Sequence, residues 1–158
     1  MTAPKSPSRT PPSAASPTTI VTSLLTIETS GRGFSDLTAE ITKFVRDAGA
    51  REGAVTLFIR HTSASLTIQE NADPTVLEDL ATALDRLAPE NAGWRHDTEG
   101  PDDMPAHIRA ALTPTQLSIP LMNGALALGT WQGIYLCEHR DHGGPRSLLA
   151  TVWGESAA

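Results

Sequence analysis

Cysteine is nearly absent from this sequence of 158 residues, which contains only Cys137. A single cysteine cannot form a disulfide within the chain, and it rules out a zinc site built from cysteine pairs. The sequence also lacks an apolar run of the length that crosses a membrane, and its N-terminus lacks the apolar stretch of a secretory signal. These absences predict a cytoplasmic protein with no membrane partner.

The sequence also has no excess of basic residues, and it contains few aromatic residues. The net charge is −6 at pH 7, and aromatic residues make up 4% of the chain. Nucleic-acid binding relies on a positive surface or on aromatic platforms for the bases, so the sequence predicts no nucleic-acid partner. The chain is long enough for one domain with a sizeable core.

The first 17 residues are rich in Pro, Ser and Thr and show no apolar periodicity. Such a segment cannot bury enough apolar surface to offset the entropy lost on ordering it. We therefore predict that residues 1–17 are a disordered tail and that residues 18–158 form a single domain.

Apolar residues at helical spacing predict two main helices. The first follows a cap at Ser35 or Asp36, and the second begins with Asp73 as its cap and ends at Pro89. One or two further helical turns are expected at Ile108–Leu112.

Runs of alternating or β-branched residues predict strands between and after these helices. The last four strands follow one another through short turns, which favours an antiparallel α+β fold over a doubly wound parallel one. The predicted strands are 19–28, 54–60, 65–69, 116–119, 125–128, 133–137 and 147–153.

The stretch from Trp94 to His107 is a candidate metal site. It contains His96 and His107 with carboxylates between them, and imidazole and carboxylate are ligands that zinc and related metals favour. Pro105 suits the first turn of a helix, so His107 is expected in that turn. On spacing alone, a solvated acidic loop with two surface histidines is a slightly better interpretation.

Two polar clusters lie next to predicted strands. His61 and the hydroxyls of Ser63 and Ser65 lie between two strands, where they could bind an anion or a metal-bound ligand. The alternative is an ordinary hairpin turn. Glu70 and Asn71 end the next strand and have no evident local structural task, which makes them candidates for a site.

Two further segments carry candidate side chains. Trp131 could stack on a flat ring, although a tryptophan beside a turn more often belongs to a core or a subunit contact. Between Glu138 and Arg146, six of nine side chains are ionisable. Arg146 could bind a phosphate there, and the alternative is a charged hairpin loop.

Five motifs, in order, resemble the YjbQ-like family, also called the secondary thiamine-phosphate synthase family. The resemblance spans roughly Thr18 to Glu155 and leaves out only the proline-rich tail. The motifs are His61-Thr62-Ser63-Ala64-Ser65, Glu70-Asn71-Ala72-Asp73-Pro74, His96 with Asp102-Asp103-Met104-Pro105-Ala106-His107, Leu128-Gly129-Thr130-Trp131-Gln132-Gly133-Ile134, and Glu138-His139-Arg140.

The resemblance implies a small α+β domain with a two-sheet β sandwich that assembles into a homotrimer. It also implies a histidine-rich site for a divalent metal, zinc or magnesium, with three ligands: His61, His96 and His107. The catalytic candidates are Glu70, Asn71 and Glu138. The candidates for substrate binding are Ser63, Ser65, Trp131 and Arg146.

The activity that the resemblance implies is thiamine-phosphate synthesis. A hydroxymethylpyrimidine diphosphate would be coupled to a thiazole phosphate with loss of pyrophosphate. The same side chains could instead serve a metal-dependent hydrolase or lyase of a small phosphorylated metabolite. They could also belong to a non-catalytic trimeric protein that binds a metal or small ligand.

Overall fold

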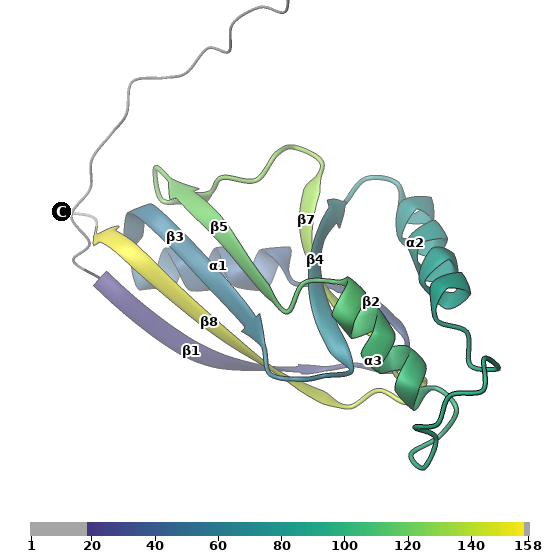
Figure 1. Cartoon of the computed structure of the whole chain (residues 1–158). Coiled ribbons are helices and arrows are strands. Elements are labelled where there is room, and N and C mark those ends of the chain that lie inside the picture. The colour runs from purple at the N-terminus through teal and green to yellow at the C-terminus, as the bar shows by residue number, and fades with distance from the viewer. Residues whose placement is uncertain (1–18, 157–158) are drawn as a thin grey trace, which may run out of the picture.

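The computed structural model describes residues 19–156, which form two antiparallel sheets and three helices (Figure 1). The predicted tail, residues 1–17, lies outside the described residues. In chain order the elements are β1 (Thr19–Glu28), β2 (Gly33–Asp36), α1 (Thr38–Ala48), β3 (Ala50–Ile59), β4 (Ala64–Glu70), α2 (Pro74–Leu87), α3 (Asp103–Leu112), β5 (Gln116–Met122), β6 (Ala125–Leu126), β7 (Gln132–Glu138) and β8 (Pro145–Ser156).

The larger sheet has the strand order β1-β8-β3-β5-β6, and the smaller has the order β2-β7-β4. In β3 the alternating residues Val55, Leu57 and Ile59 are buried, and Val55 and Leu57 lie opposite Val152 and Ala150 of β8. These side chains share one core with buried residues of α1, β4 and β7. The predicted α+β fold with two antiparallel sheets is therefore confirmed.

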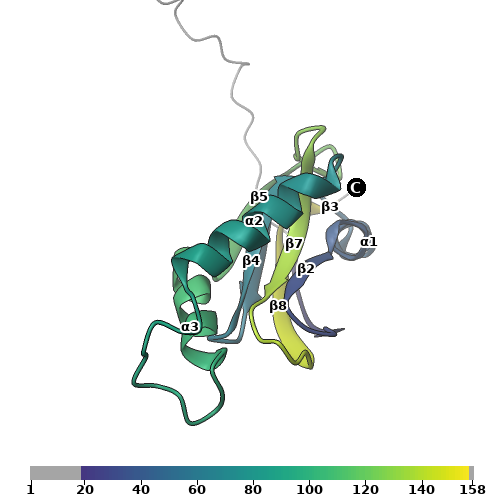
Figure 2. The ribbon, with the colours of Figure 1, turned by 90° about the vertical axis from the view of Figure 1, so that its right-hand side faces the viewer.

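The helices cover different parts of this framework. α1 buries Ile41 and Val45, and its apolar face joins the common core. α2 and α3 lie beside β4, away from α1 (Figure 2). α2 contributes no fully buried residue, although one face of it is apolar. None of the helices within residues 19–156 is long and apolar enough to cross a membrane.

Three details of the predicted elements are wrong. Residues Gly33–Asp36 form strand β2 on β7, where the cap of a helix was expected at Ser35 or Asp36. α1 has Leu37 as its cap residue, although Asp36 Oδ1 still accepts a hydrogen bond from the Thr38 backbone N–H at 2.8 Å. α3 is a full third helix that begins at Asp103, so His107 lies in its second turn.

Candidate functional site

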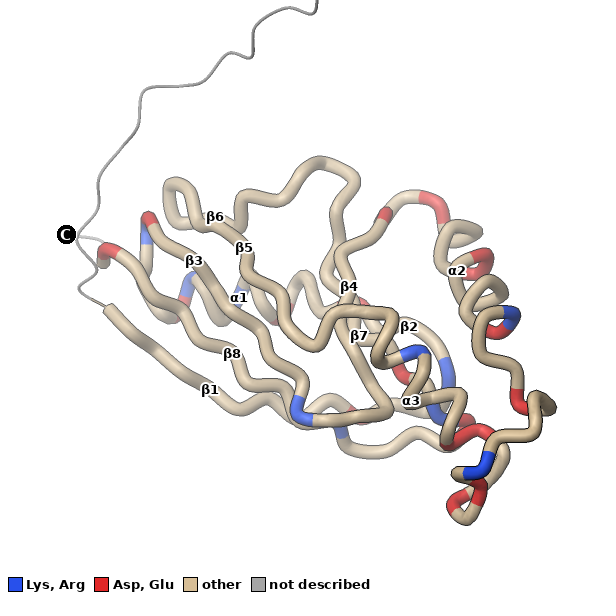
Figure 3. The backbone as a smooth tube through the Cα atoms, in the orientation of Figure 1, with Lys and Arg blue, Asp and Glu red and all other residues tan. Residues whose placement is uncertain are grey.

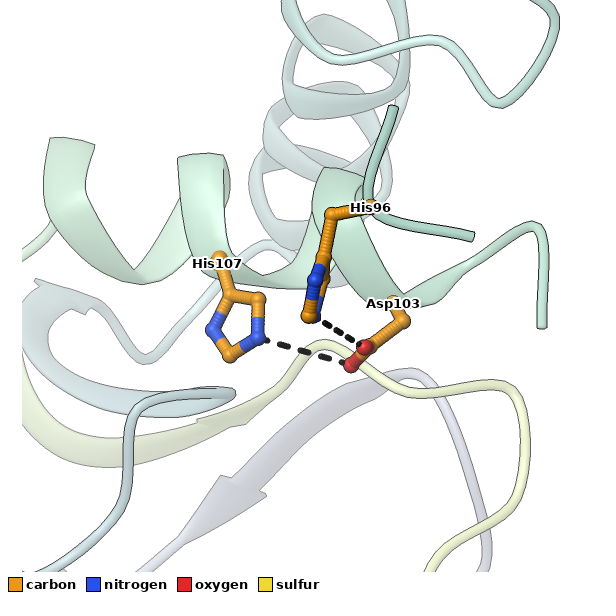
Figure 4. Close-up of side chains that lie close together, drawn as sticks. All are labelled: His96, Asp103 and His107. Atoms are coloured by element: carbon orange, nitrogen blue, oxygen red, sulfur yellow. Dashed lines mark ion pairs between the residues drawn. The ribbon is translucent and has the colours of Figure 1, made fainter. Parts of the chain in front are cut away.

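Three side chains meet where the α2–α3 loop joins α3 (Figure 4). His96 comes from the loop, whereas Asp103 and His107 lie four residues apart on one face of the helix. His96 Nε2 is 2.8 Å from Asp103 Oδ2, and His107 Nε2 is 3.5 Å from Asp103 Oδ1. One ligand atom from each side chain lies within 4.8 Å of the other two. We call this group the His–Asp cluster.

The orientation of His107 suits a metal ligand. Its Nδ1 lies 3.0 Å from the carbonyl oxygen of Thr62, which can only accept, so Nδ1 must carry the proton. In the neutral ring, Nε2 is therefore unprotonated and faces the Asp103 carboxylate. A hydrogen bond from the second ring nitrogen to a carbonyl is the usual way in which proteins orient a metal-binding histidine.

Asp103 is the buried member of the cluster, with 2% of its side chain exposed. Although His96 is close, Oδ2 of Asp103 has no hydrogen-bond partner within residues 19–156. A buried carboxylate oxygen without a donor is costly unless a cation neutralises it. On its other side, Oδ1 accepts a hydrogen bond from Arg140 Nη1 at 2.5 Å, so the carboxylate is fixed in position.

The donor set fits a divalent metal. Two imidazoles and a carboxylate would supply three ligands and leave a position for water or substrate, as in catalytic zinc sites. This chemistry suits zinc or a related transition metal better than magnesium, which prefers oxygen ligands. Figure 3 shows that charged residues gather around α2, α3 and the loop between them, while the strands of the larger sheet carry few.

His61 does not join the His–Asp cluster, so its predicted role as a ligand is revised. Its Nε2 accepts a hydrogen bond from the Ser147 backbone N–H at 2.7 Å, and its Nδ1 lies 3.3 Å from Arg146 Nη1. Partial burial and the nearby Arg146 lower the pKa of His61. The ring is thus held neutral as a structural acceptor, and Asp103 takes its place among the candidate ligands.

Glu138 is buried and forms an ion pair with Arg146, which is partly exposed. Arg146 donates to the two carboxylate oxygens of Glu138 from Nε at 2.6 Å and from Nη2 at 2.5 Å, and from Nη1 to Ser63 Oγ at 3.2 Å. Burial raises the pKa of Glu138, but hydrogen bonds from Arg146, the Arg140 backbone and Thr29 outweigh it and lower the pKa overall. The pair therefore supports the wall of the site, and neither charge is available to a substrate.

Ser65 is fully buried, which argues against its predicted role in substrate binding. Its hydroxyl lies 2.8 Å from His139 Nε2 and accepts a hydrogen bond from Thr113 Oγ1 at 2.5 Å. Burial and the charge of Arg109 lower the pKa of His139 to about 4, so this histidine is neutral at pH 7. The network ties β4, α3 and β7 together beneath the site.

The other predicted residues lie at the far end of β4. Asn71 donates from its backbone N–H to the carbonyl oxygen of Trp131 at 3.1 Å, and Glu70 pairs with Gln132 of β7. The six residue steps from Ala64 to Glu70 cover about 20 Å of extended strand. Within one chain, Glu70, Asn71 and Trp131 are therefore too far from the His–Asp cluster to act on the same atom.

A cleft next to the cluster contains two residues that sequence reasoning missed. The cleft has a volume of about 700 Å³ and is lined by residues of β3, the β3–β4 turn and α3, among them Phe58, Arg60, His61, Ser63, His107 and Ala110. We call it the α3 cleft. Phe58 and Arg60 belong to no recognisable sequence motif. They line the cleft only because the end of β3 packs next to α3, and the sequence does not show this contact. Asp103, by contrast, was detectable from its helical spacing to His107.

The fold and the sequence both match known proteins. The family model described as "UPF0047 protein YjbQ-like" matches residues 23–155. A UPF0047 protein of Synechocystis is 51% identical over 133 residues, which are 84% of this chain and 90% of that protein. The UPF0047 protein YjbQ of Salmonella typhimurium is 47% identical over 83% of this chain and 96% of its own length.

Solved structures support the same relationship. The crystal structure of an uncharacterized conserved protein of the YjbQ/UPF0047 family from Clostridium acetobutylicum is 37% identical and aligns with a TM-score of 0.76. The alignment covers 82% of this chain and 98% of that one. Since sequence and fold agree over nearly the whole described region, the chain belongs to the UPF0047 YjbQ-like family.

Proposed function

We propose that this protein is a metal-dependent enzyme that holds a divalent cation, best zinc, at the His–Asp cluster and acts on a small phosphorylated substrate. The observation that carries the proposal is the buried carboxylate of Asp103: each of its oxygens lies near one histidine nitrogen, and Oδ2 has no hydrogen-bond partner within the described chain. The adjoining α3 cleft gives a small molecule access to His107.

Within this class, the family resemblance favours thiamine-phosphate synthesis. In that reaction the thiazole nitrogen attacks the methylene carbon of the pyrimidine, while the bond from that carbon to the diphosphate oxygen breaks and pyrophosphate leaves. A bound cation would supply positive charge for the departing diphosphate. The chain itself orients His107 through Thr62 and holds Asp103 through Arg140.

Hydrolysis is a second candidate, because three protein ligands leave room for a metal-bound water, the arrangement of zinc hydrolases. Product analysis separates the two reactions. The protein is incubated with both substrates in the presence of zinc, magnesium or a chelator, and the products are separated by chromatography. Zinc-dependent formation of thiamine phosphate supports the synthase, consumption of one substrate alone supports the hydrolase, and zinc binding without turnover indicates a binding protein.

We also propose that the chain forms a homotrimer, as the resemblance implies. The outer face of the larger sheet exposes apolar side chains on neighbouring strands, where Ile20 lies opposite Trp153 and Leu24 opposite Leu149. Ile20 is 76% exposed and Leu24 is 52% exposed, and residues of this size are seldom left in water as a group. In a closed trimer, the two neighbouring copies around the threefold axis would cover them.

A further inference from the structure

Arg109 is the largest of the fully buried side chains in the described chain, although it carries a charge. It lies on α3 two residues after His107, so its side chain points to the opposite side of the helix from the His–Asp cluster. Its Nη2 lies 3.2 Å from Asp85 Oδ1 of α2, and that carboxylate is half exposed. Its Nε has no hydrogen-bond partner among residues 19–156. A buried charge that is only partly neutralised costs stability, so packing alone does not explain this arginine.

The guanidinium of Arg109 joins two backbone segments through their carbonyl oxygens. Nη2 donates a hydrogen bond to Ala88 at 2.9 Å, and Nη1 donates one to His139 at 3.5 Å. Ala88 is fully buried and caps the end of α2, so the α2–α3 loop begins there. His139 is also buried and directly precedes Arg140, which holds Asp103. One side chain of α3 therefore connects the loop that carries one candidate ligand with the arginine that holds another.

The α2–α3 loop depends on such anchors, because it extends away from both sheets before it returns to α3 (Figure 2). Further along the loop, Glu90 pairs with Arg32, and the carbonyl oxygen of Glu99 accepts a hydrogen bond from Arg140. The side chain of Arg109 is 2% exposed, against 21% for Arg140 and 30% for Arg32. A hydrogen bond held away from water is electrostatically stronger, so Arg109 provides the firmest of these attachments.

We propose that Arg109 is a positioning residue of the metal site. From the opposite side of α3 it fixes the start of the loop that carries His96 and the segment that carries Arg140, so the three candidate ligands are in place before a cation binds. This inference rests on the proposed function and deepens it, because it names a residue that preorganises the site without touching the metal. Replacing a residue that orients metal ligands typically weakens metal affinity by about 10- to 100-fold.

Two substitutions separate a positioning role from a general effect on stability. Arg109→Lys keeps the charge but has a single donor nitrogen, whereas the guanidinium reaches the two carbonyls from two separate nitrogens. Arg109→Met keeps most of the buried volume and removes the buried charge, so it folds even where lysine is not tolerated. Zinc affinity, measured by competition with a chelator, should fall about tenfold in both variants. In the metal-free protein, the backbone amides of residues 88–102 should exchange about tenfold faster, the effect of losing one charged hydrogen bond.

Val45→Ala is the control for stability. It removes two methyl groups from the buried face of α1, which lies away from α2 and α3 (Figure 2), and lowers stability without a change near the site. Its zinc affinity and the amide exchange of residues 88–102 should match those of the wild type. Circular dichroism and light scattering confirm that each variant keeps its fold and assembly.

Wild-type zinc affinity and amide exchange in both Arg109 variants would overturn the inference. An equal loss of zinc affinity in Val45→Ala would overturn it too, because Arg109 would then only stabilise the fold. A wild type that takes up no zinc would refute the proposed function, whereas the exchange measurement, made without metal, would still test the anchor. Normal zinc uptake by the wild type, with unchanged affinity and exchange in both variants, would refute only this inference.

Discussion

Arg140 and Asp103 are joined by a hydrogen bond of 2.5 Å between Nη1 and Oδ1, although they come from segments 37 residues apart. The same guanidinium donates from Nε to Asp102 Oδ2 at 2.9 Å. One arginine after β7 thus holds both carboxylates at the start of α3, including the one that we assign to the metal.

Replacing Arg140 by glutamine should lower the free energy of unfolding by about 2–3 kcal/mol, because two buried carboxylates lose their counter-charge. Urea denaturation of the metal-free protein measures this change. Arg95→Gln, on the exposed α2–α3 loop, is the control and should stay within about 0.5 kcal/mol of the wild type. Equal stability of the two variants would mean that the Arg140 contacts do not hold α3.

Removal of a candidate ligand tests the His–Asp cluster directly. His107→Ala should remain folded but lose most of its bound zinc and any synthase activity, because one of three ligands is missing. Elemental analysis gives the metal content, and chromatography gives the product. His142→Ala should keep both, since His142 lies outside the cluster. If His107→Ala kept its full zinc content, the metal-site assignment would be wrong, and residues 94–107 would be interpreted as a solvated acidic stretch.

The glycine pair after β7 offers a test with a matched control. A Cβ atom added at Gly143 would lie 1.9 Å from the carbonyl oxygen of Thr29, whereas one added at Gly144 would meet nothing within 4 Å. Gly143→Ala must therefore displace the loop that carries Arg140, and it should cost more than about 2 kcal/mol of unfolding free energy. Gly144→Ala should change that value by about 0.5 kcal/mol or less. Thermal unfolding of both variants shows whether the difference exists.

Buried His139 predicts how stability depends on pH. Burial lowers its pKa in the folded protein from 6.5 to about 4, so the unfolded chain binds a proton more readily. The stabilisation is complete above pH 6.5 and is lost as the pH falls toward 4, by about 2 kcal/mol between pH 7 and pH 5. The lowered pKa of His61 acts in the same direction.

His139→Gln isolates this contribution, because glutamine keeps a polar group near Ser65 but does not titrate. Denaturant titrations at pH 7 and pH 5 should show a smaller loss of stability in the variant than in the wild type. An unchanged loss would assign the pH dependence to other groups.

The proposed trimer makes a prediction about mass. Light scattering at micromolar concentration should give three times the chain mass of 16.7 kDa. Leu24→Glu places a charge on the outer face of the larger sheet and should shift the mass toward that of one chain. Leu87→Glu changes another exposed leucine, on α2, and should leave the trimer intact. A monomeric wild type would contradict the proposed assembly.

Much of the fold could be predicted because local patterns and the final packing agree. The β-branched alternation of Thr19–Glu28 gave the bounds of β1, and the cap at Asp73 gave the start of α2. β2 was missed because Gly33–Asp36 has no strand pattern of its own and depends on pairing with β7. Short strands held by long-range pairs leave little trace in a local sequence window.

The site was predicted less completely than the fold. His96 and His107 were identified from residue type, but Asp103 was not singled out from the other carboxylates between them, because the start of α3 was placed too late. Glu70 and Asn71 were grouped with the histidines although β4 separates them from the cluster. The distance in space between two motifs depends on the direction and length of the strands that connect them. Residue types alone do not determine this distance.

Of the three candidate ligands, only His96 lies outside regular structure, on the loop of residues 88–102. A cation shared with α3 would therefore act as a cross-link that divides this loop into two shorter ones and lowers its conformational entropy. Local opening of the loop would then be coupled to metal release, so amide exchange and protease cleavage there would slow as the cation binds. The concentration of the cation would therefore control how long the loop stays folded, in addition to its effect on the reaction at the site.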